Sequence, residues 1–156
     1  MNHELTPAHI DAYRADGFVI IEDFLDAAEL ETWRSTVDDA VAERNGKRFD
    51  DESIMRDEFN DDVKTEFYDK VFDQMVNLWK THDPMRELIL DPRIGEMAAK
   101  LAGLSGVRVW HDQALIKRPY ANPTAFHLDA PYWSFTSKDA ISLWIALDDA
   151  TATNGC

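Results

Sequence analysis

Basic residues and cysteine are scarce in this sequence. Only 16 Lys and Arg stand against 30 Asp and Glu, which gives a formal net charge of −14. Binding to nucleic acid or to an anionic membrane needs a basic surface, so this balance argues against both kinds of partner. The one cysteine, Cys156, permits no disulfide within the chain, which fits a reducing cytosol.

Long apolar runs and a secretory signal are also lacking. No apolar stretch is long enough to span a bilayer, and the N-terminal residues have neither the basic nor the apolar region of a signal peptide. We therefore expect a cytoplasmic protein. The 156 residues are one ordinary domain or part of a larger one, and 45% of them are hydrophobic, which suffices for a core. The pattern does not indicate an oligomeric state.

Helix-capping signals dominate the first part of the chain. Thr6 and Pro7 suit the N-cap and first position of a helix that stops at Gly17. Asp26 and Glu29 have the spacing of a capping box for a second helix, ending at Asn45-Gly46. That helix has one apolar face, which is formed by Leu30, Trp33, Val37 and Val41.

Further elements follow from local composition. Residues 18–21 form a β-branched run that predicts a buried strand. Residues 47–62 are polar and predict a long loop, either a lid over a binding site or a disordered insertion. Apolar residues at helical spacing predict a helix over 67–79, and Asp83-Pro84 and Asp91-Pro92 each open a short helix, the second ending at Gly103.

The character of the sequence changes after residue 106. Three strands are predicted, over 107–117, 124–129 and 141–147, and Asn154-Gly155 is a hairpin signal. Helices first and strands later indicate an α+β chain. In the third strand, alternation directs one set of side chains toward the helices, namely Ile141, Leu143, Ile145 and Leu147, and Trp144 to the other face.

His127 and Asp129 are the candidate metal ligands. In an extended segment, residues two apart point to the same face, so both side chains could bind one ion. Imidazole and carboxylate are the ligands of non-haem Fe(II) in oxygen-activating enzymes. A surface His and Asp with no metal would give the same tripeptide, so this motif alone leaves both interpretations open.

Several motifs together resemble the phytanoyl-CoA dioxygenase family, whose members are mostly iron(II)- and 2-oxoglutarate-dependent oxygenases. The resemblance covers most of the chain and rests on six segments, 16–20, 23–25, 111–119, 125–133, 143–151 and 154–156. It implies a double-stranded β-helix, a jelly-roll, cupin-like barrel with helices outside. The whole chain, 1–156, would be a single incomplete oxygenase domain, with a mainly helical part over 1–105 and the first barrel strands over 106–156.

The same resemblance implies roles for individual residues. His127 and Asp129 would be two iron ligands, while Gln113 and Trp144 would line the 2-oxoglutarate pocket. Lys117 matches a family lysine that we assign to the co-substrate region, although a structural salt bridge is the simpler role. Tyr132 and Trp133 would border the substrate. His111 is expected to support the site or to serve in packing, without binding the metal.

The resemblance also implies what lies outside the sequence. A third ligand, a histidine, and an arginine for 2-oxoglutarate would follow Cys156, so we expect this chain alone to be inactive. The complete protein would use Fe(II), 2-oxoglutarate and O2 to hydroxylate an unactivated C–H of a small organic or acyl substrate. Two alternatives stay open: a barrel that binds metal or a partner without turnover, and a cupin-type enzyme with another divalent metal.

Overall fold

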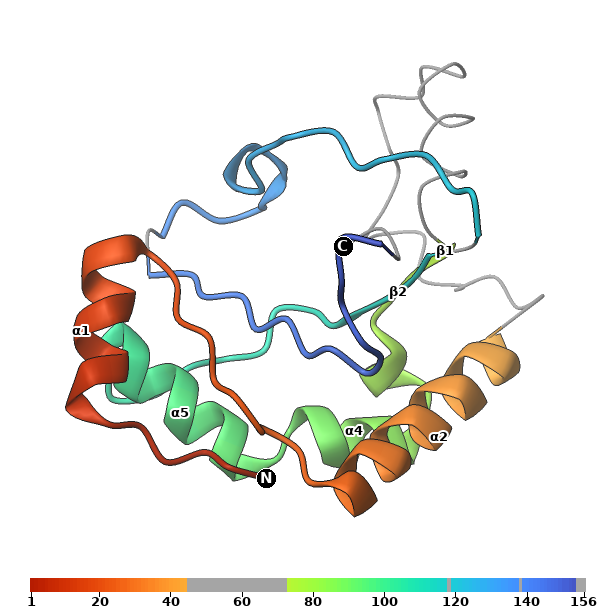
Figure 1. The fold of residues 1–156 in the computed structure, drawn as a ribbon, viewed down its shortest axis with the longest axis horizontal. Helices are drawn as coiled ribbons and strands as arrows, with labels where there is room; N and C mark the ends of the chain where they lie inside the picture. The colour runs from red at the N-terminus through yellow and green to blue at the C-terminus, as the bar shows by residue number, and fades with distance from the viewer. Residues whose placement is uncertain (45–72, 118, 138, 154–156) are drawn as a thin grey trace.

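The computed structural model describes residues 1–44, 73–117, 119–137 and 139–153, and its elements are mainly helical (Figure 1). The expectations for Asn45-Gly46, the loop 47–62 and the Asn154-Gly155 turn lie outside the described residues. Helices together with a small sheet make the described part α+β. The elements in chain order are α1 (Pro7–Asp16), α2 (Ala27–Arg44), β1 (Asp73–Val76), the 3-10 helix η1 (Leu78–Lys80), α4 (Asp83–Ile89), α5 (Pro92–Ala102), β2 (Gln113–Ile116) and the 3-10 helix η2 (Ala130–Tyr132).

The predicted helix ends of α1 and α5 are confirmed. The Thr6 hydroxyl accepts a hydrogen bond from the His9 N–H at 3.2 Å, and Gly17 ends α1 in the left-handed conformation with φ of 81°. Asp91 caps α5 by accepting from the Arg93 N–H at 2.9 Å. These two helices lie side by side in Figure 1.

The capping box of α2 is also confirmed. Asp26 accepts hydrogen bonds from the backbone N–H groups of Ala28 and Glu29, at 2.9 and 2.8 Å, and the Glu29 carboxylate accepts from the Asp26 N–H at 3.2 Å. The helix buries Trp33 and Val41 on the predicted face, together with Thr36 and Ala40. Burial of this face positions α2 against the rest of the core.

The opening of α4 corrects a prediction by one residue. His82, and not Asp83, is the N-cap, because its Nδ1 accepts a hydrogen bond from the Met85 N–H at 3.2 Å. Asp83 therefore lies in the first turn, where a negative charge still favours the helix dipole. An imidazole in this role was not evident from sequence, since oxygen-bearing side chains are the usual caps.

The two strands form one antiparallel pair, and they correct the predicted helix over 67–79. Asp73 pairs with Ile116 and Val76 with Gln113. Apolar residues spaced three and four apart suggested a helix here, but the backbone pairs with a segment about 40 residues later, which local spacing does not reveal. At Asn77 the chain turns with φ of 59° and enters η1, so the described part of the predicted helix is a strand and a 3-10 turn.

Four other strand predictions are wrong in extent or in kind. The strand predicted over 107–117 is limited to β2, and segments 18–21, 124–129 and 141–147 are not in a sheet. Within the described ranges only β1 and β2 pair, so these segments have no ladder partner there. Phe18 and Ile20 are 63% and 67% exposed, so 18–21 is not buried either. The double-stranded β-helix implied by the resemblance is not present among the described residues.

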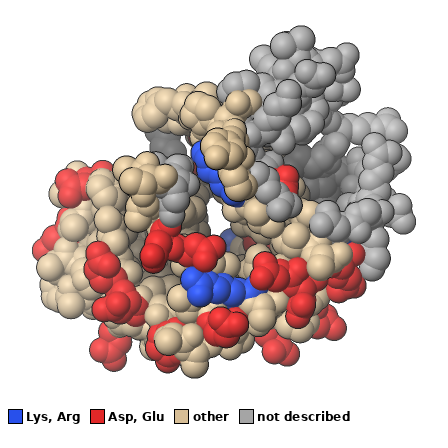
Figure 2. Space-filling model, turned by 45° about the vertical axis from the view of Figure 1, so that its right-hand side comes forward, with Lys and Arg blue, Asp and Glu red and all other residues tan. Residues whose placement is uncertain are grey.

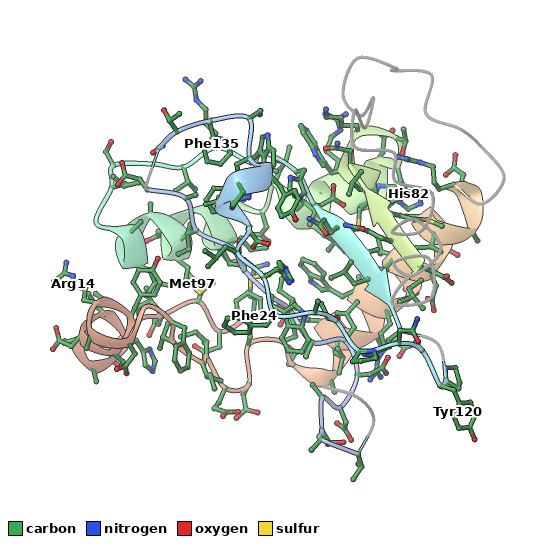
Figure 3. The ribbon with its side chains drawn as sticks, turned by 90° about the horizontal axis from the view of Figure 1, so that it is seen from above. Arg14, Phe24, His82, Met97, Tyr120 and Phe135 are labelled. Atoms are coloured by element: carbon green, nitrogen blue, oxygen red, sulfur yellow. The ribbon has the colours of Figure 1, made fainter. Side chains whose placement is uncertain are left out.

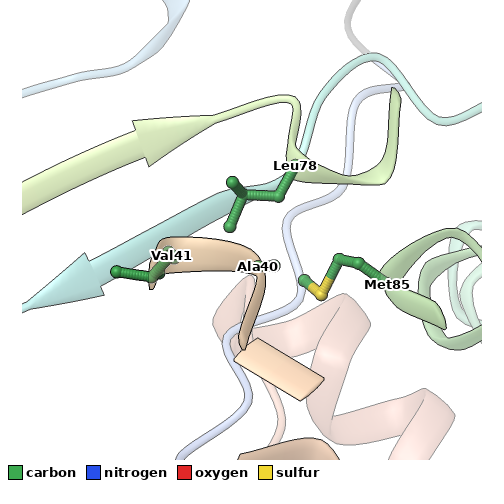
Figure 4. Packing of buried hydrophobic residues seen from close by; sticks show 5 residues of the cluster. Ala40, Val41, Leu78 and Met85 are labelled. Atoms are coloured by element: carbon green, nitrogen blue, oxygen red, sulfur yellow. The ribbon is translucent and has the colours of Figure 1, made fainter. Parts of the chain in front are cut away.

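The core lies where α2, η1, α4 and β2 meet. Leu78 is fully buried at its centre, and Figure 4 shows it together with Ala40, Val41 and Met85. Ala114 of β2 completes this cluster. The core therefore attaches the two-stranded sheet to the helices.

The segment 139–147 runs across the molecule and attaches to α2 (Figure 1). The four residues predicted to face the helices, at 141, 143, 145 and 147, are half-buried, while Trp144 is 69% exposed. The Arg34 guanidinium holds the end of this segment, since it donates to the Leu147 carbonyl and forms an ion pair with Asp148 at 3.1 Å. The predicted alternation of inward and outward side chains along 141–147 is confirmed, although the segment is not in a sheet.

The surface reflects the acidic composition. Figure 2 shows Asp and Glu spread over the visible face, with few Lys or Arg among them. Such dispersion is expected of a solvated surface. Along the described stretches, no helix combines the length and the apolarity needed to cross a membrane.

Candidate metal centre

His127 and Asp129 lie together at the end of an irregular, extended segment. The His127 Nε2 is 3.3 Å from Asp129 Oδ1, and the two side chains are 51% and 58% exposed. Asp129 precedes η2, and its carbonyl accepts the Tyr132 N–H at 2.8 Å. The strand predicted here is absent, and Asp129 has helical dihedrals, φ −76° and ψ −34°, yet the two side chains still converge.

A hydrogen bond to the backbone determines which nitrogen of the His127 ring carries the proton. The His127 Nδ1 is 2.8 Å from the Ala125 carbonyl, which only accepts, so Nδ1 carries a proton and donates. In the neutral ring this leaves the Nε2 lone pair facing the Asp129 oxygen. Two acceptor atoms then face each other at short range, an arrangement that is favourable only with a cation between them or a proton on Nε2.

The donor set and its spacing fit a divalent metal. Ligand atoms at right angles around an ion, each about 2.1 Å from it, are roughly 3 Å apart, close to the observed separation. Neutral imidazole with carboxylate suits Fe(II) in particular. No cluster of three or more His, Cys, Asp or Glu suited to a metal occurs in the stretches that the structure describes, so two donors are what these residues supply. A protonated His127 in an ion pair with Asp129 is the alternative explanation of the same distance.

A hydrogen-bonded chain of three side chains links the two strands to His111. The Gln74 amide donates to Gln113 Oε1 at 2.7 Å, and the Gln113 amide nitrogen is 2.5 Å from His111 Nε2. Burial lowers the pKa of His111, while the negative charges of Asp112 and Asp129 oppose that shift. The supporting role expected of His111 stays a prediction.

Gln74 is a residue that the sequence did not single out. It belongs to the stretch predicted as a helix, where its side chain had no evident partner. The pairing of Val76 with Gln113 places Gln74 diagonally across from Gln113 on the neighbouring strand. Gln74 could have been identified from the sequence only if β1 had been predicted as a strand paired with β2.

Aromatic rings form a cluster beside His111. Trp110 contacts Phe135 edge-to-face at 5.1 Å between centroids and Trp133 at 6.4 Å, and its ring is 4.2 Å from that of His111. Trp133 and Phe135 stack at 5.1 Å. Trp133 was expected at the substrate border, whereas Trp110 and Phe135 were missed. Figure 3 shows Phe135 far from Tyr120, whose ring points away from the molecule.

A comparison with protein families decides the identity of the chain. The model of the family described as Phytanoyl-CoA dioxygenase (PhyH) matches residues 13–156. The chain belongs to the phytanoyl-CoA dioxygenase family. This match includes both the helical region and the segment with His127 and Asp129, and members of the family are generally Fe(II)/2-oxoglutarate oxygenases.

Two kinds of curated relatives resemble the chain at low identity. Phytanoyl-CoA dioxygenase domain-containing protein 1 is 26% identical in Bos taurus and 24% in Mus musculus, each alignment covering 97% of this chain and 63% of the relative. A methylphosphonate hydroxylase of Gimesia maris is 27% identical over 100% of this chain and 56% of its own length. The chain thus spans about three fifths of the length of these relatives. No solved structure matches significantly.

Trp144 and Lys117 are the two other residues expected at the co-substrate pocket. Trp144 is 69% exposed on segment 139–147, and in the described part of the chain it makes no hydrogen bond or ring contact with His127 or Asp129. Lys117 directly follows β2 and is half-buried. The structure therefore brings together His127 with Asp129, and Gln113 with His111. The pocket roles of Trp144 and Lys117 stay predictions.

Asp112 anchors the strand that carries Gln113. Its backbone carbonyl accepts the Asn77 N–H at 3.0 Å, and its side chain, which is 8% exposed, accepts from the Trp79 N–H at 3.5 Å. The other carboxyl oxygen has no hydrogen-bond partner among the described residues. Burial raises the pKa of Asp112, and the backbone N–H of Trp79 partly offsets that effect. The start of β2 is thereby fixed to η1.

Proposed function

We propose that this chain supplies His127 and Asp129 to the metal of an Fe(II)- and 2-oxoglutarate-dependent oxygenase that hydroxylates an unactivated C–H. The observation that carries the proposal is the 3.3 Å approach of Nε2 to Oδ1, with Nδ1 held by the Ala125 carbonyl. Membership of the phytanoyl-CoA dioxygenase family supports the same reaction class. When bound, the iron with 2-oxoglutarate and O2 supplies the oxidising chemistry.

The residues of the chain have distinct tasks in this reaction. His127 presents one lone pair, because its other nitrogen is occupied by the Ala125 carbonyl, and the ring orientation is fixed before metal binding. Asp129 supplies negative charge that offsets part of the charge of a divalent ion. Together they would hold the metal through one nitrogen and one oxygen, and further ligands would complete the site.

Gln113 would bind the carboxylate of the co-substrate. Its side-chain oxygen accepts from Gln74 and its amide nitrogen lies 2.5 Å from His111 Nε2, so the second N–H of that amide is the group left for a carboxylate, which needs donors. The rings of Trp110, Trp133 and Phe135 would exclude water on the neighbouring side and contact an apolar part of the substrate. The methylphosphonate hydroxylase relative is named for a small phosphonate, and a small organic or acyl substrate is our proposal for this chain.

The decisive test is an anaerobic titration of the natural full-length protein with Fe(II) and 2-oxoglutarate. A weak visible charge-transfer band is expected when both are present, and none with Fe(II) alone. Metal binding without this band would support a cupin-type site that does not use 2-oxoglutarate. The band without succinate formation in the presence of O2 and a panel of small acids would support a binding protein without turnover.

A further inference from the structure

The chain of Gln74, Gln113 and His111 has a definite direction. An amide group can donate through its nitrogen and accept through its oxygen, so each contact fixes which end of the next group is available. Gln74 donates to the oxygen of Gln113, and the nitrogen of Gln113 then faces His111 Nε2. A hydrogen bond at the second contact requires His111 Nε2 to accept, which leaves the ring proton on Nδ1.

We propose that Gln74 is a positioning residue that holds Gln113 as a hydrogen-bond donor toward the candidate site and holds His111 as the Nδ1–H tautomer. The use of that donor for 2-oxoglutarate rests on the proposed function. The state of His111 does not, because it follows from the hydrogen-bond chain alone. The proposal can therefore be tested twice, by the affinity for 2-oxoglutarate and by the tautomer of His111 in the protein without ligand.

Independent features support a fixed hydrogen-bond chain that ends on a neutral imidazole. His111 is half-buried, and its burial lowers its pKa, so the neutral ring that can accept at Nε2 is the favoured form at neutral pH. The β1–β2 pairing holds the backbones of Gln74 and Gln113 in a fixed register. Reversing both amides would make Gln113 present its oxygen to His111, and it would then present no donor to a carboxylate on that side.

The reversed chain can be imposed by substitution. In Gln74→Glu the side chain becomes an acceptor only, so Gln113 must turn its nitrogen toward position 74 and its oxygen toward His111. The matched control is Gln74→Met, which keeps the approximate length and removes the hydrogen bond without imposing either direction. Gln74 is exposed, so neither substitution disturbs the core.

The first measurement is the tautomer of His111 by ¹⁵N NMR of its ring nitrogens in the natural full-length protein, without metal or co-substrate. Nδ1–H is expected in the wild type, Nε2–H in Gln74→Glu, and a mixture in Gln74→Met. An Nε2–H tautomer in the wild type, or one that Gln74→Glu does not change, would overturn the proposal.

The second measurement is the dissociation constant of 2-oxoglutarate with anaerobic Fe(II) protein. Loss of one donor to a carboxylate is expected to weaken binding roughly 5- to 10-fold in Gln74→Glu and about 2-fold in Gln74→Met. In a Gln113→Met background, Gln74→Glu should cause no further loss. An equal loss in that background would show that Gln74 does not act through Gln113. If the wild type binds no 2-oxoglutarate, the proposed function fails, and the tautomer alone decides the inference.

Discussion

At the scale of single residues, the ligand pair gives the most direct prediction. His127→Ala or Asp129→Ala in the natural full-length protein is expected to abolish succinate formation coupled to substrate oxidation, because either change removes a donor from the metal. The matched control is Asp139→Ala, a change of an exposed carboxylate outside the motif, which should retain wild-type turnover. Turnover close to wild type in either ligand variant, measured as succinate per oxidised product, contradicts the assignment.

Buried Asp112 predicts a pH dependence of stability. Burial raises its pKa in the folded protein, so the protonated form favours folding. Its contribution is complete below the unfolded pKa of about 3.9 and is lost as the pH rises through the higher folded value.

Asp112→Asn cannot titrate, so the free energy of unfolding of the variant relative to wild type should increase over this pH range and then level off. Urea unfolding at a series of pH values measures that difference, in which other groups largely cancel. A difference that does not change with pH would show that Asp112 keeps an ordinary pKa in the folded protein.

At the scale of elements, the N-cap of α1 can be tested with two matched substitutions of Thr6. Thr6→Ala removes the hydroxyl that accepts from the His9 N–H and should lower the free energy of unfolding by about 1 kcal/mol. Thr6→Ser retains the acceptor and should cost clearly less. Equal losses in urea unfolding would mean that the Thr6 methyl group, and not the hydroxyl, stabilises this end of the helix.

Helix ends were predictable from sequence because their causes are local. Thr6, Asp26 and Asp91 each accept hydrogen bonds from N–H groups two or three residues ahead, a relation visible in the sequence. Strands were less predictable, because β1 exists through its pairing with β2, and its own spacing imitates a helix.

The metal motif was predictable and its surroundings were not. His127 and Asp129 are two residues apart, so their approach needed only a local bend. Gln74 and Gln113 are 39 residues apart, and Phe135 reaches Trp110 from another segment. Contacts of this kind depend on how the chain returns on itself, which one sequence without its fold does not disclose.

At the scale of the whole molecule, the core around Leu78 connects helices and sheet. Leu78→Ala should lower the free energy of unfolding by roughly 2–5 kcal/mol, since the side chain is fully buried and its loss leaves a cavity. Leu90→Ala is the control, because Leu90 is 44% exposed. If chemical denaturation shows similar losses for both variants, Leu78 is not at the centre of a packed core in solution.

The turn after Asp129 links metal binding to an optical signal. The Asp129 carbonyl accepts the Tyr132 N–H, and Trp133 follows directly in contact with Trp110 and Phe135. An ion that immobilises the Asp129 carboxylate also restrains this turn and the indole attached to it. We therefore expect Zn²⁺, which does not absorb visible light, to change the tryptophan fluorescence, and Trp133→Phe to remove most of that change. The protein would then report the occupancy of its own metal site without an added dye.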